Sequence, residues 1–440
     1  MTGSEAPDPI RVCVVAEFYP RANDPVLGVW AHEQAKAARD AGADVRVLVL
    51  HRPVPPRATR PRDLWRTLRT MRAQPRDAVL DGIPVRYVRF YSPPRGSSYG
   101  SWGRWASRPL ARALRALHRE FPFALIHAHN AVPAGDAVRR VVAKGGALGD
   151  VPWLVSVHGG DVYFTAQRSP DGKHAVQATF AAADRVLANS RGTAERCAAL
   201  DAVDPSVVQL GTDLPEASDI ERWQEARAWP DRLEDHEDRR GSDRTSDDAP
   251  GPTLVTIAHL VPRKRHEDVL RALWLLRARY PRLRYRVIGS GPHESKLRRL
   301  ADELGVADRV DWRGQLPHRE ALAAARDADL FVMPSIDEAF GVAYIEAMAA
   351  AMPAIASLGE AGPTEIADAG DGITLVPPGD VEALAEALDG LLDDPKIRRS
   401  QGASARATVA ASFTWDRCGA ATVAAYRDAI ATRAAAGRAR

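Results

Sequence analysis

The chain has 440 residues, of which 45% are hydrophobic and 27% charged, and its formal net charge is +3. This length exceeds one ordinary core, so the composition predicts a soluble protein with two domains. No segment approaches the ~20 apolar residues of a membrane-spanning helix, and residues 1–9 lack the apolar region of a signal peptide. Three distant cysteines, Cys13, Cys197 and Cys418, fit neither a disulfide framework nor a zinc site. We therefore expect a cytoplasmic protein.

The N-terminal residues have the pattern of a β-α-β unit. Residues 11–16 are apolar and predict a strand, residues 30–41 predict a helix that stops at a glycine, and residues 45–50 predict a second strand. Such units build parallel sheets, whose ligands bind beyond the carboxyl ends of the strands. The loop over residues 17–29 opens at such an end. Its glycine, Gly28, is therefore either a ligand-binding residue or a plain turn residue.

The next region is strongly basic, with sixteen arginines and four acidic residues between positions 51 and 120. Leu64, Leu68 and Met71 have the spacing of a short amphipathic helix. Further on, residues 91–108 interleave arginines with aromatic residues. The aromatic residues are Tyr99, Trp102 and Trp105, and the arginines are Arg95, Arg104 and Arg108.

Two interpretations of the basic region stay open. Arginines alternating with interfacial aromatics suit contact of residues 52–108 with an anionic membrane, at the inner face of the cell membrane. The same residues equally suit a solvated flap over a binding site. Nucleic acid is not an expected partner, because no recognised reading module accompanies the charge.

Histidines end two of the predicted strands. Strand alternation over residues 124–129 places His127 and His129 on one face, but without cysteine or carboxylate partners they are expected to be core or cleft residues rather than metal ligands. A second strand runs into His158-Gly-Gly-Asp161, which leaves the His158 imidazole at the carboxyl edge of the sheet. Asp161 is either a site residue or a helix cap.

Residues 217–252 crowd Asp, Glu and Arg together, with almost no aliphatic residues after Leu233. Mixed charge with so little to bury predicts a mobile linker or insertion between the domains.

A second domain is predicted from residue 253. A strand over residues 253–258 runs into a basic segment containing His259, Arg263 and Lys264. Residues 285–292 combine a strand with a glycine turn at Gly289, which alone is weak evidence for a dinucleotide site. The Asp-Ala-Asp sequence at 327–329 joins a helix end to a strand, which is the wrong place for a metal site, so no metal is expected.

The most informative stretch follows a buried strand at residues 328–335. Glu338 precedes the first turn of a predicted helix and Glu346 lies inside it, while Gly341 and Val342 supply first-turn amides that lack partners within the helix. Such a helix end attracts phosphate, which carboxylates avoid. The two glutamates should therefore contact hydroxyls on either side of the anion. A nucleotide-sugar has this layout, although a random glutamate pair is more often two solvated helix charges.

Glu338 and Glu346, with seven residues between them and Phe-Gly after the first, resemble the E-x7-E signature of retaining glycosyltransferases of family four. The resemblance covers nearly the whole chain outside residues 217–252. It implies the GT-B fold, an α/β architecture with two Rossmann-like parallel-sheet domains facing each other across a cleft.

The resemblance also implies roles for individual residues. Lys264 keeps the position of a cation on the diphosphate, whereas His259 replaces an arginine, so donor affinity should depend on pH unless Arg263 or Arg265 substitutes. The implied catalytic residues are Glu338, His158 and Lys264. The implied donor-binding residues are His259, Lys264, Glu338, Phe340, Gly341, Val342, Glu346, Gly28 and Gly289, with Asp161 and Arg263 as further candidates.

The implied domains are an acceptor-side domain over 1–215, onto which a C-terminal helix over 416–440 packs back, a charged linker over 216–252 and a nucleotide-sugar domain over 253–415. The implied reaction moves a sugar from a nucleoside-diphosphate sugar to an acceptor hydroxyl, with retention and without a cofactor or metal. UDP- or GDP-sugars are the expected donors, and the acceptor is a carbohydrate, a lipid-linked saccharide or a small molecule. The alternatives are a nucleotide-sugar epimerase or hydrolase, or a catalytically degenerate membrane-associated scaffold.

Overall fold

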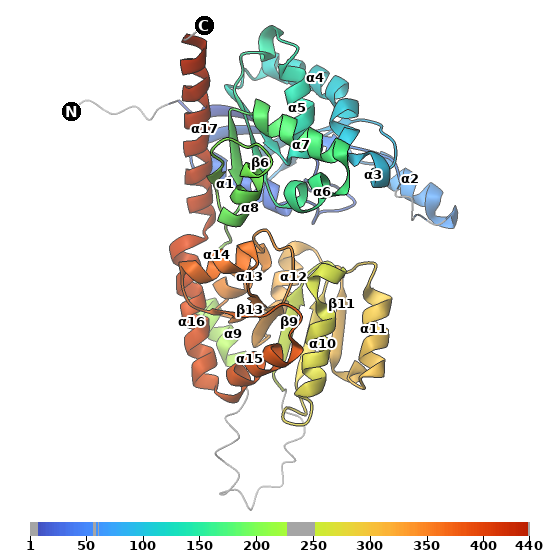
Figure 1. Cartoon of the computed structure of the whole chain (residues 1–440), viewed down its shortest axis with the longest axis vertical. Coiled ribbons are helices and arrows are strands. Elements are labelled where there is room, and N and C mark those ends of the chain that lie inside the picture. The colour runs from blue at the N-terminus through green and yellow to red at the C-terminus, as the bar shows by residue number, and fades with distance from the viewer. Residues whose placement is uncertain (1–7, 56–58, 60, 227–250, 439–440) are drawn as a thin grey trace, which may run out of the picture. The chain divides into compact units, whose positions relative to one another are not determined.

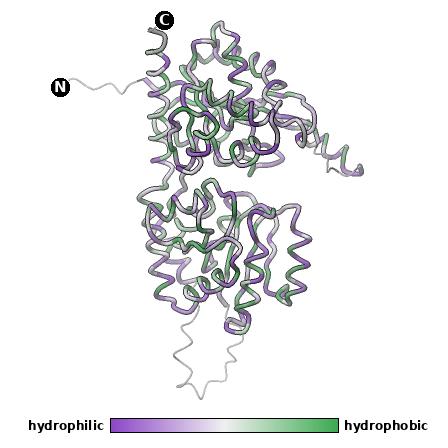
Figure 2. Tube along the Cα trace, in the orientation of Figure 1, coloured by the Kyte–Doolittle hydropathy of each residue, from purple (hydrophilic) through white to green (hydrophobic). Residues whose placement is uncertain are grey.

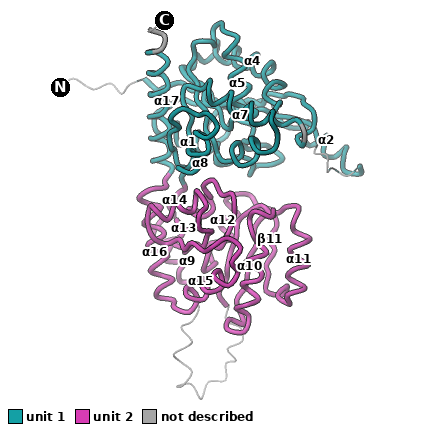
Figure 3. Tube along the Cα trace, viewed as in Figure 1, with its two compact units in different colours: residues 1–211, 415–440 teal, residues 212–414 magenta. Residues whose placement is uncertain are grey.

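A computed structural model describes residues 8–55, 59, 61–226 and 251–438 (Figure 1). It divides into two compact units, which Figure 3 colours separately. Unit 1 comprises residues 1–211 and 415–440, and unit 2 comprises residues 212–414. The sequence predicted boundaries at residues 215, 252 and 415.

Unit 1 is built on an eight-stranded sheet in the order β3-β4-β2-β1-β5-β6-β7-β8. All neighbouring strands are parallel except β3 and β4, which form an antiparallel hairpin. The strands are β1 (Ile10–Ala16), β2 (Ala43–His51), β3 (Asp77–Leu80), β4 (Ile83–Arg89), β5 (Leu125–His129), β6 (Trp153–Val157), β7 (Arg185–Ala188) and β8 (Ser206–Val207). Because β1, β5 and β6 are neighbours, the residues that follow them meet at one edge of the sheet.

Helices cover both faces of this sheet, as expected for right-handed crossovers between parallel strands (Figure 1). The helices of unit 1 are α1 (Val29–Asp40), α2 (Leu64–Arg72), α3 (Arg95–Ser98), α4 (Trp102–Glu120), α5 (Asp136–Val142), α6 (Ala166–Arg168), α7 (Pro170–Ala182), α8 (Arg191–Ala198) and α17 (Trp415–Arg438). α17 returns from the end of the chain to pack on α1. There Gln34 Nε2 donates to Thr422 Oγ1 at 3.1 Å, and a Cβ at Gly419 would lie 2.2 Å from the Ala37 carbonyl oxygen.

Unit 2 contains a six-stranded, wholly parallel sheet in the order β11-β10-β9-β12-β13-β14. Its strands are β9 (Thr253–Ile257), β10 (Arg284–Ile288), β11 (Val310–Gly314), β12 (Leu330–Met333), β13 (Ala354–Ser357) and β14 (Ile373–Val376). Its helices are α9 (Ala217–Ala226), α10 (His266–Leu275), α11 (Glu294–Glu303), α12 (His318–Ala325), α13 (Val342–Ala349), α14 (Ala361–Ala369), α15 (Val381–Asp393) and α16 (Pro395–Ser412). The central pair β9 and β12 carries the two loops that contain Lys264 and Glu338.

The predicted charged linker is partly wrong. Residues 217–226 form α9, whose Ile220 is buried and whose Trp223 ring lies 4.5 Å beneath the Arg326 guanidinium carbon. One buried aliphatic and one covered aromatic are enough to hold this short helix against unit 2. Residues 227–250 lie outside the described residues.

The expectation that aromatic residues line the surface of the basic region is also only partly right. Trp102 is 4% exposed and packs edge-on against Phe90 and Tyr99, so it belongs to the core of unit 1. Trp105, three positions farther along α4, is 50% exposed. Positions three apart differ by about 60° around a helix, which carries Trp105 outside the buried stripe of α4 at whose margin Trp102 lies. The predicted amphipathic helix is α2, which alternates purple and green in Figure 2.

Candidate functional site

The predicted cation of unit 2 is bound to the predicted carboxylate. Lys264 lies in the turn after β9 and Glu338 in the loop after β12, and Lys264 Nζ donates to Glu338 Oε2. Ser335 Oγ donates to the same oxygen at 2.8 Å, and Arg263 Nη1 lies 3.6 Å from it. The side chains of Lys264 and Glu338 are about nine-tenths buried. We call these four residues the Lys264–Glu338 cluster.

Burial and charge act against each other in this cluster. Burial alone would raise the pKa of Glu338, but Lys264, Arg263 and the hydrogen bonds outweigh it and leave that pKa below its ordinary value. Burial lowers the pKa of Lys264, and the attraction of Glu338 offsets only part of this. Glu338 is therefore held ionised by cations that lie at the start of a helix.

That helix is α13, and its first turn has the predicted geometry. Gly341 occupies the N-cap position with φ of 88°, and a Cβ there would lie 2.4 Å from the Tyr344 ring. Only glycine combines this backbone with this contact. The Gly341 and Val342 amides lie where the helix supplies no carbonyl partner. Phe340 is 1% exposed and its ring packs edge-on against Phe413, so its side chain belongs to the core, and its role in donor binding stays a prediction.

Glu346 lies one turn into α13 and has a partner that the sequence did not indicate. His318 Nε2, at the start of α12, lies 2.6 Å from Glu346 Oε1. His318 lies 28 positions before Glu346 in the sequence, and no sequence motif links the two residues. His259 is exposed. Of the two arginines that could replace its expected charge, Arg263 reaches Glu338. Arg265 is instead engaged by Asp268, whose carboxylate accepts a hydrogen bond from Arg265 Nε at 2.7 Å.

Both candidate glycines have a structural reason. Gly289 has φ of 139°, and a Cβ there would lie 2.0 Å from the Ala258 carbonyl oxygen. Gly28 has φ of 66° at the N-terminus of α1, where a Cβ would lie 2.2 Å from the Phe18 backbone. Gly289 lets the loops after β9 and β10 approach closely, and Gly28 lets the two ends of the loop after β1 do the same. A ligand-binding role for either glycine stays a prediction.

In unit 1, His158 follows β6 and belongs to a row of aromatic rings. Its ring centroid lies 4.0 Å from that of Trp30 on α1, and its Nε2 lies 3.1 Å from His129 Nδ1. The His127 ring lies beside that of His129, with centroids 4.3 Å apart and planes tilted by 30°. Its nitrogens lie 2.9 Å from the Tyr426 hydroxyl on α17 and 2.8 Å from Ser156 Oγ. We call His127, His129 and His158 the histidine row.

All three imidazoles are neutral near physiological pH. Burial lowers the pKa of His129 to about 3, and it lowers the pKa of His127 and His158 well below the ordinary value. Two buried nitrogens, His129 Nε2 and His158 Nδ1, have no hydrogen-bond partner among the described residues. His127 is thus the expected core histidine, while His158 keeps one nitrogen for a ligand.

Asp161 caps a neighbouring segment rather than its own helix. Its oxygens accept the Ala131 amide at 2.8 Å, the Val132 amide at 3.1 Å and Asn130 Nδ2 at 3.3 Å. Burial raises the pKa of Asp161 to about 6, and these hydrogen bonds oppose that rise. Asp161 thereby fixes the backbone turn after β5.

Sequence reasoning missed a second buried carboxylate beside that turn. Glu17 directly follows β1, is 7% exposed and accepts the Tyr99 hydroxyl at 2.6 Å. The Arg95 guanidinium lies 4.2 Å from the Tyr99 ring centroid. Burial raises the pKa of Glu17, with Arg95 the strongest opposing charge. Tyr99, predicted as a surface aromatic, is therefore tied to the ligand-facing edge of the sheet.

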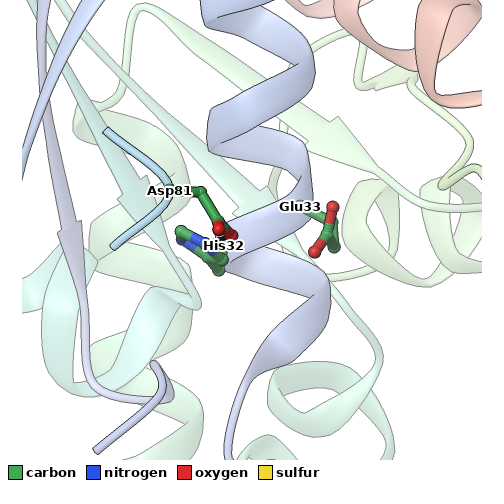
Figure 4. A group of neighbouring side chains, drawn as sticks. All are labelled: His32, Glu33 and Asp81. Atoms are coloured by element: carbon green, nitrogen blue, oxygen red, sulfur yellow. Dashed lines mark hydrogen bonds and ion pairs between the residues drawn. The ribbon is translucent and has the colours of Figure 1, made fainter. Parts of the chain in front are cut away.

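One group of side chains in the described residues has metal-ligand spacing: His32, Glu33 and Asp81 (Figure 4). Both His32 nitrogens are already engaged, by the Tyr19 hydroxyl at 2.7 Å and by Asp81 at 2.9 Å. Lys36 Nζ lies 2.8 Å from Glu33 and 3.8 Å from Asp81. The ammonium of Lys36 serves as the cation here, and the group ties α1 to the β3–β4 hairpin.

The aspartates of the Asp-Ala-Asp sequence turn to different partners. Asp327 is paired with Arg286, whereas Asp329 Oδ2 accepts the Thr253 amide at 2.8 Å. Their positions match the expected role in joining α12 to β12.

Two family models match the chain. Residues 27–215 match Glycosyltransferase Family 4, and residues 241–408 match the glycosyl transferases group 1 family. Together they span most of unit 1 and of unit 2. No helix within the described ranges is long and apolar enough to cross a membrane.

Among curated proteins, the chain is 34% identical over 176 residues to a GDP-mannose-dependent alpha-(1-6)-phosphatidylinositol monomannoside mannosyltransferase of Mycolicibacterium smegmatis. That match covers 38% of this chain and 46% of the relative. The chain is also 33% identical over 260 residues to a D-inositol 3-phosphate glycosyltransferase of Mycobacterium bovis, covering 56% of this chain and 49% of the relative. The chain thus spans about half the length of these curated relatives.

Solved structures agree over nearly the whole chain. Sucrose-phosphate synthase from Thermosynechococcus elongatus superimposes with a TM-score of 0.71 at 20% identity, covering 96% of this chain and 99% of that one. HepE from Anabaena, in complex with UDP and glucose, gives 0.66 at 18% identity, covering 95% and 99%. Likeness at this identity establishes the fold, which is GT-B, with two parallel-sheet α/β units.

Proposed function

We propose that this chain, which combines a Glycosyltransferase Family 4 match with a glycosyl transferases group 1 match, transfers a sugar from a nucleoside-diphosphate sugar to an acceptor hydroxyl, retaining the anomeric configuration without a metal ion. The observation that carries the proposal is the Lys264–Glu338 cluster at the N-terminus of α13. Cations and free amides converge there with a carboxylate, as binding of a diphosphate beside a sugar requires.

The leaving group is a nucleoside diphosphate, so the protein's main task is to stabilise the charge that grows on it. Lys264, Arg263 and the Gly341 and Val342 amides supply positive charge and hydrogen-bond donors. The bond from the sugar C1 to the diphosphate oxygen breaks, and the acceptor oxygen bonds to C1 on the same face. The acceptor proton passes to the departing phosphate. No cofactor or side-chain nucleophile enters this scheme.

Glu338 and Glu346 would contact the sugar and the ribose. Every contact of the Glu338 carboxylate within the described residues falls on Oε2. Its other oxygen, Oε1, is thereby left to accept sugar hydroxyls while Oε2 holds Lys264 in place. Glu346 is already oriented by His318. His158, with one unpartnered nitrogen, would lie beside the transferred sugar.

A thermal-shift panel with UDP, GDP, ADP, dTDP and their common sugars, with and without a chelator, tests donor binding. One diphosphate at 100 times its Kd should raise the melting temperature by roughly 5 °C or more. The rise should survive the chelator and disappear in Glu346→Ala but not in the exposed control Glu382→Ala. A GDP or UDP preference would match the sugar nucleotides named for the relatives and the HepE complex.

Two results would favour the other functions. Consumption of the donor sugar in the absence of any acceptor would indicate an epimerase or hydrolase. A flat panel with all nucleotides would indicate a scaffold without donor binding.

We further propose that unit 1 contacts an anionic membrane through α2 and α4. Trp65 on α2 is 78% exposed and Trp105 on α4 is 50% exposed. Arginines at positions 104, 108, 112, 115 and 119 form one exposed stripe along α4. Aromatic rings beside a basic stripe suit the interface of an anionic bilayer. The phosphatidylinositol-based acceptor named for one relative would lie in such a bilayer.

Flotation with vesicles tests this membrane contact. The protein should float with phosphatidylglycerol vesicles and not with phosphatidylcholine vesicles. Each arginine near the surface contributes about 1 kcal/mol, so a triple change of Arg104, Arg108 and Arg112 to Gln should weaken binding roughly 100-fold. Equal flotation of this variant and a unit 2 control would refute the contact. The control changes to Gln three exposed arginines, Arg277, Arg284 and Arg299.

A further inference from the structure

A cavity of about 540 Å³ lies wholly within unit 1, at the carboxyl edge of its sheet. Its walls come from the loops after β1, β5 and β6 and from the segment around Arg95. Open α/β sheets bind ligands at this edge. The cavity is separate from the Lys264–Glu338 cluster, which belongs to unit 2, and none of its lining residues has a role in donor binding except the candidate Asp161.

The polar wall of the cavity offers acceptors for hydroxyl groups. Asn130 is 5% exposed, and its Oδ1 is buried without a hydrogen-bond partner within the described residues, because only its Nδ2 is used by Asp161. A buried acceptor without a donor costs roughly 1–3 kcal/mol. A ligand hydroxyl that reaches this oxygen would remove the cost.

The same cavity carries two arginines and three aromatic rings. The Arg95 guanidinium carbon lies 4.2 Å from the Tyr99 ring centroid and 5.3 Å from that of Phe18. Arg168 is exposed, and no hydrogen bond or ion pair joins it to the described part of the chain. Phe164 is 39% exposed at the rim. The guanidinium groups therefore offer planar donors that suit a phosphate.

The two carboxylates near the cavity leave the Arg168 charge unopposed, although Glu17 offsets part of the Arg95 charge. Asp161 uses its oxygens for the Ala131 and Val132 amides and the Asn130 side chain. Glu17 is buried behind Tyr99 and accepts its hydroxyl. Both negative charges are thus bound within the protein, and Arg168 lies outside these networks.

We propose that this cavity holds the acceptor and selects a sugar or polyol bearing a phosphate. Arg95 and Arg168 bind the phosphate, Asn130 Oδ1 accepts a ring hydroxyl, and the aromatic rings pack on the ring faces. This inference rests on the proposed transferase function and adds the class of acceptor. The phosphate belongs either to a free sugar phosphate or to the head group of a phospholipid, since the recognising chemistry is the same.

Calorimetric titration of the full-length protein tests the proposal. The probes are glucose 6-phosphate and myo-inositol 1-phosphate, with glucose and myo-inositol as their uncharged counterparts and inorganic phosphate as the minimal anion. The phosphorylated probes should bind roughly tenfold or more tightly than the uncharged ones, as expected for charge-assisted hydrogen bonds. Vesicles of phosphatidylinositol and of phosphatidylglycerol present the phosphate in a phospholipid head group, so binding to them distinguishes this source from a free sugar phosphate. Competition by the free phosphates assigns binding to the cavity.

Arg168→Gln should remove the preference for the phosphorylated probe, and Arg168→Lys should keep part of it. Arg11→Gln, an exposed arginine at the start of β1 and thus far from the carboxyl edge of the sheet, is the matched control and should behave as the unchanged protein. Equal binding of charged and uncharged probes, or equal behaviour of Arg168→Gln and Arg11→Gln, would overturn the proposal. A nucleotide-induced thermal shift that persists in that case leaves the transferase function standing, so the two failures are distinguishable.

Discussion

Lys264→Met is expected to lower the rate of sugar transfer by at least ~100-fold, the usual cost of losing one donor to a developing charge. Lys264 Nζ is the buried cation of the Lys264–Glu338 cluster, beside the N-terminus of α13, where we propose that the diphosphate charge grows. Arg263 lies 3.6 Å from Glu338 and can replace only part of this charge. The measurement is single-turnover transfer with saturating donor, which separates the chemical step from binding.

The same change also leaves the buried Glu338 carboxylate without its lysine partner. Removing one partner of a buried ion pair typically destabilises a protein by about 3–5 kcal/mol. The double variant Lys264→Met with Glu338→Gln removes that unpaired charge, so it should regain most of the stability in urea unfolding without regaining activity. Lys296→Met, an exposed lysine of α11, should change neither quantity. Near-normal transfer by Lys264→Met would show that the assignment of Lys264 is wrong.

The Lys264–Glu338 contact illustrates what a sequence can predict. The two residues are 74 positions apart, yet each follows an apolar strand, and the carboxyl ends of parallel strands meet at one edge. Gly341 could be placed at a helix start because small and helix-forming residues follow it. What the pattern could not give was the order of strands, which makes β9 and β12 neighbours.

Contacts that depend on how distant helices and strands pack together could not be predicted from the sequence. Phe340 is adjacent to the glycine that starts α13, so its position suggested a ligand role, but Phe413 at the end of α16 buries it. His318 meets Glu346 only because α12 lies beside α13. The cavity beside Asn130 was not predicted for the same reason, because its lining residues are spread between positions 18 and 169 of the sequence.

Folding stability is expected to fall as the pH drops from 6.5 to 5.5, chiefly because of the histidine row. Burial lowers the pKa of all three imidazoles in the folded state, to about 3 for His129. Below the unfolded pKa of about 6.5, the unfolded chain binds protons that the folded chain refuses. Each such histidine costs up to about 1 kcal/mol over this interval.

Other titratable groups change the pH dependence of the folding stability in known directions. His51 and His266 add to the loss, since burial lowers their pKa values to about 4 and about 3. Asp161 opposes it, because its folded pKa of about 6 lies above the unfolded value, so its contribution to stability grows as the pH falls through 6. The pKa of Glu17 is also raised and acts in the same sense as Asp161. Histidines outnumber these carboxyls, so the net effect remains a loss.

His127→Gln isolates one histidine of the row. A glutamine side chain offers a donor and an acceptor for the Tyr426 and Ser156 hydroxyls that His127 contacts, so the fold should survive with some loss of stability. Between pH 7.5 and 5.5, the stability measured by urea unfolding should fall by up to about 1.4 kcal/mol less than that of the unchanged protein. His174→Gln, at an exposed position of α7, should leave the slope unchanged. If His127→Gln and the unchanged protein lose stability in parallel, folding does not lower the pKa of His127, and the expectation that this imidazole is neutral in the folded state is wrong.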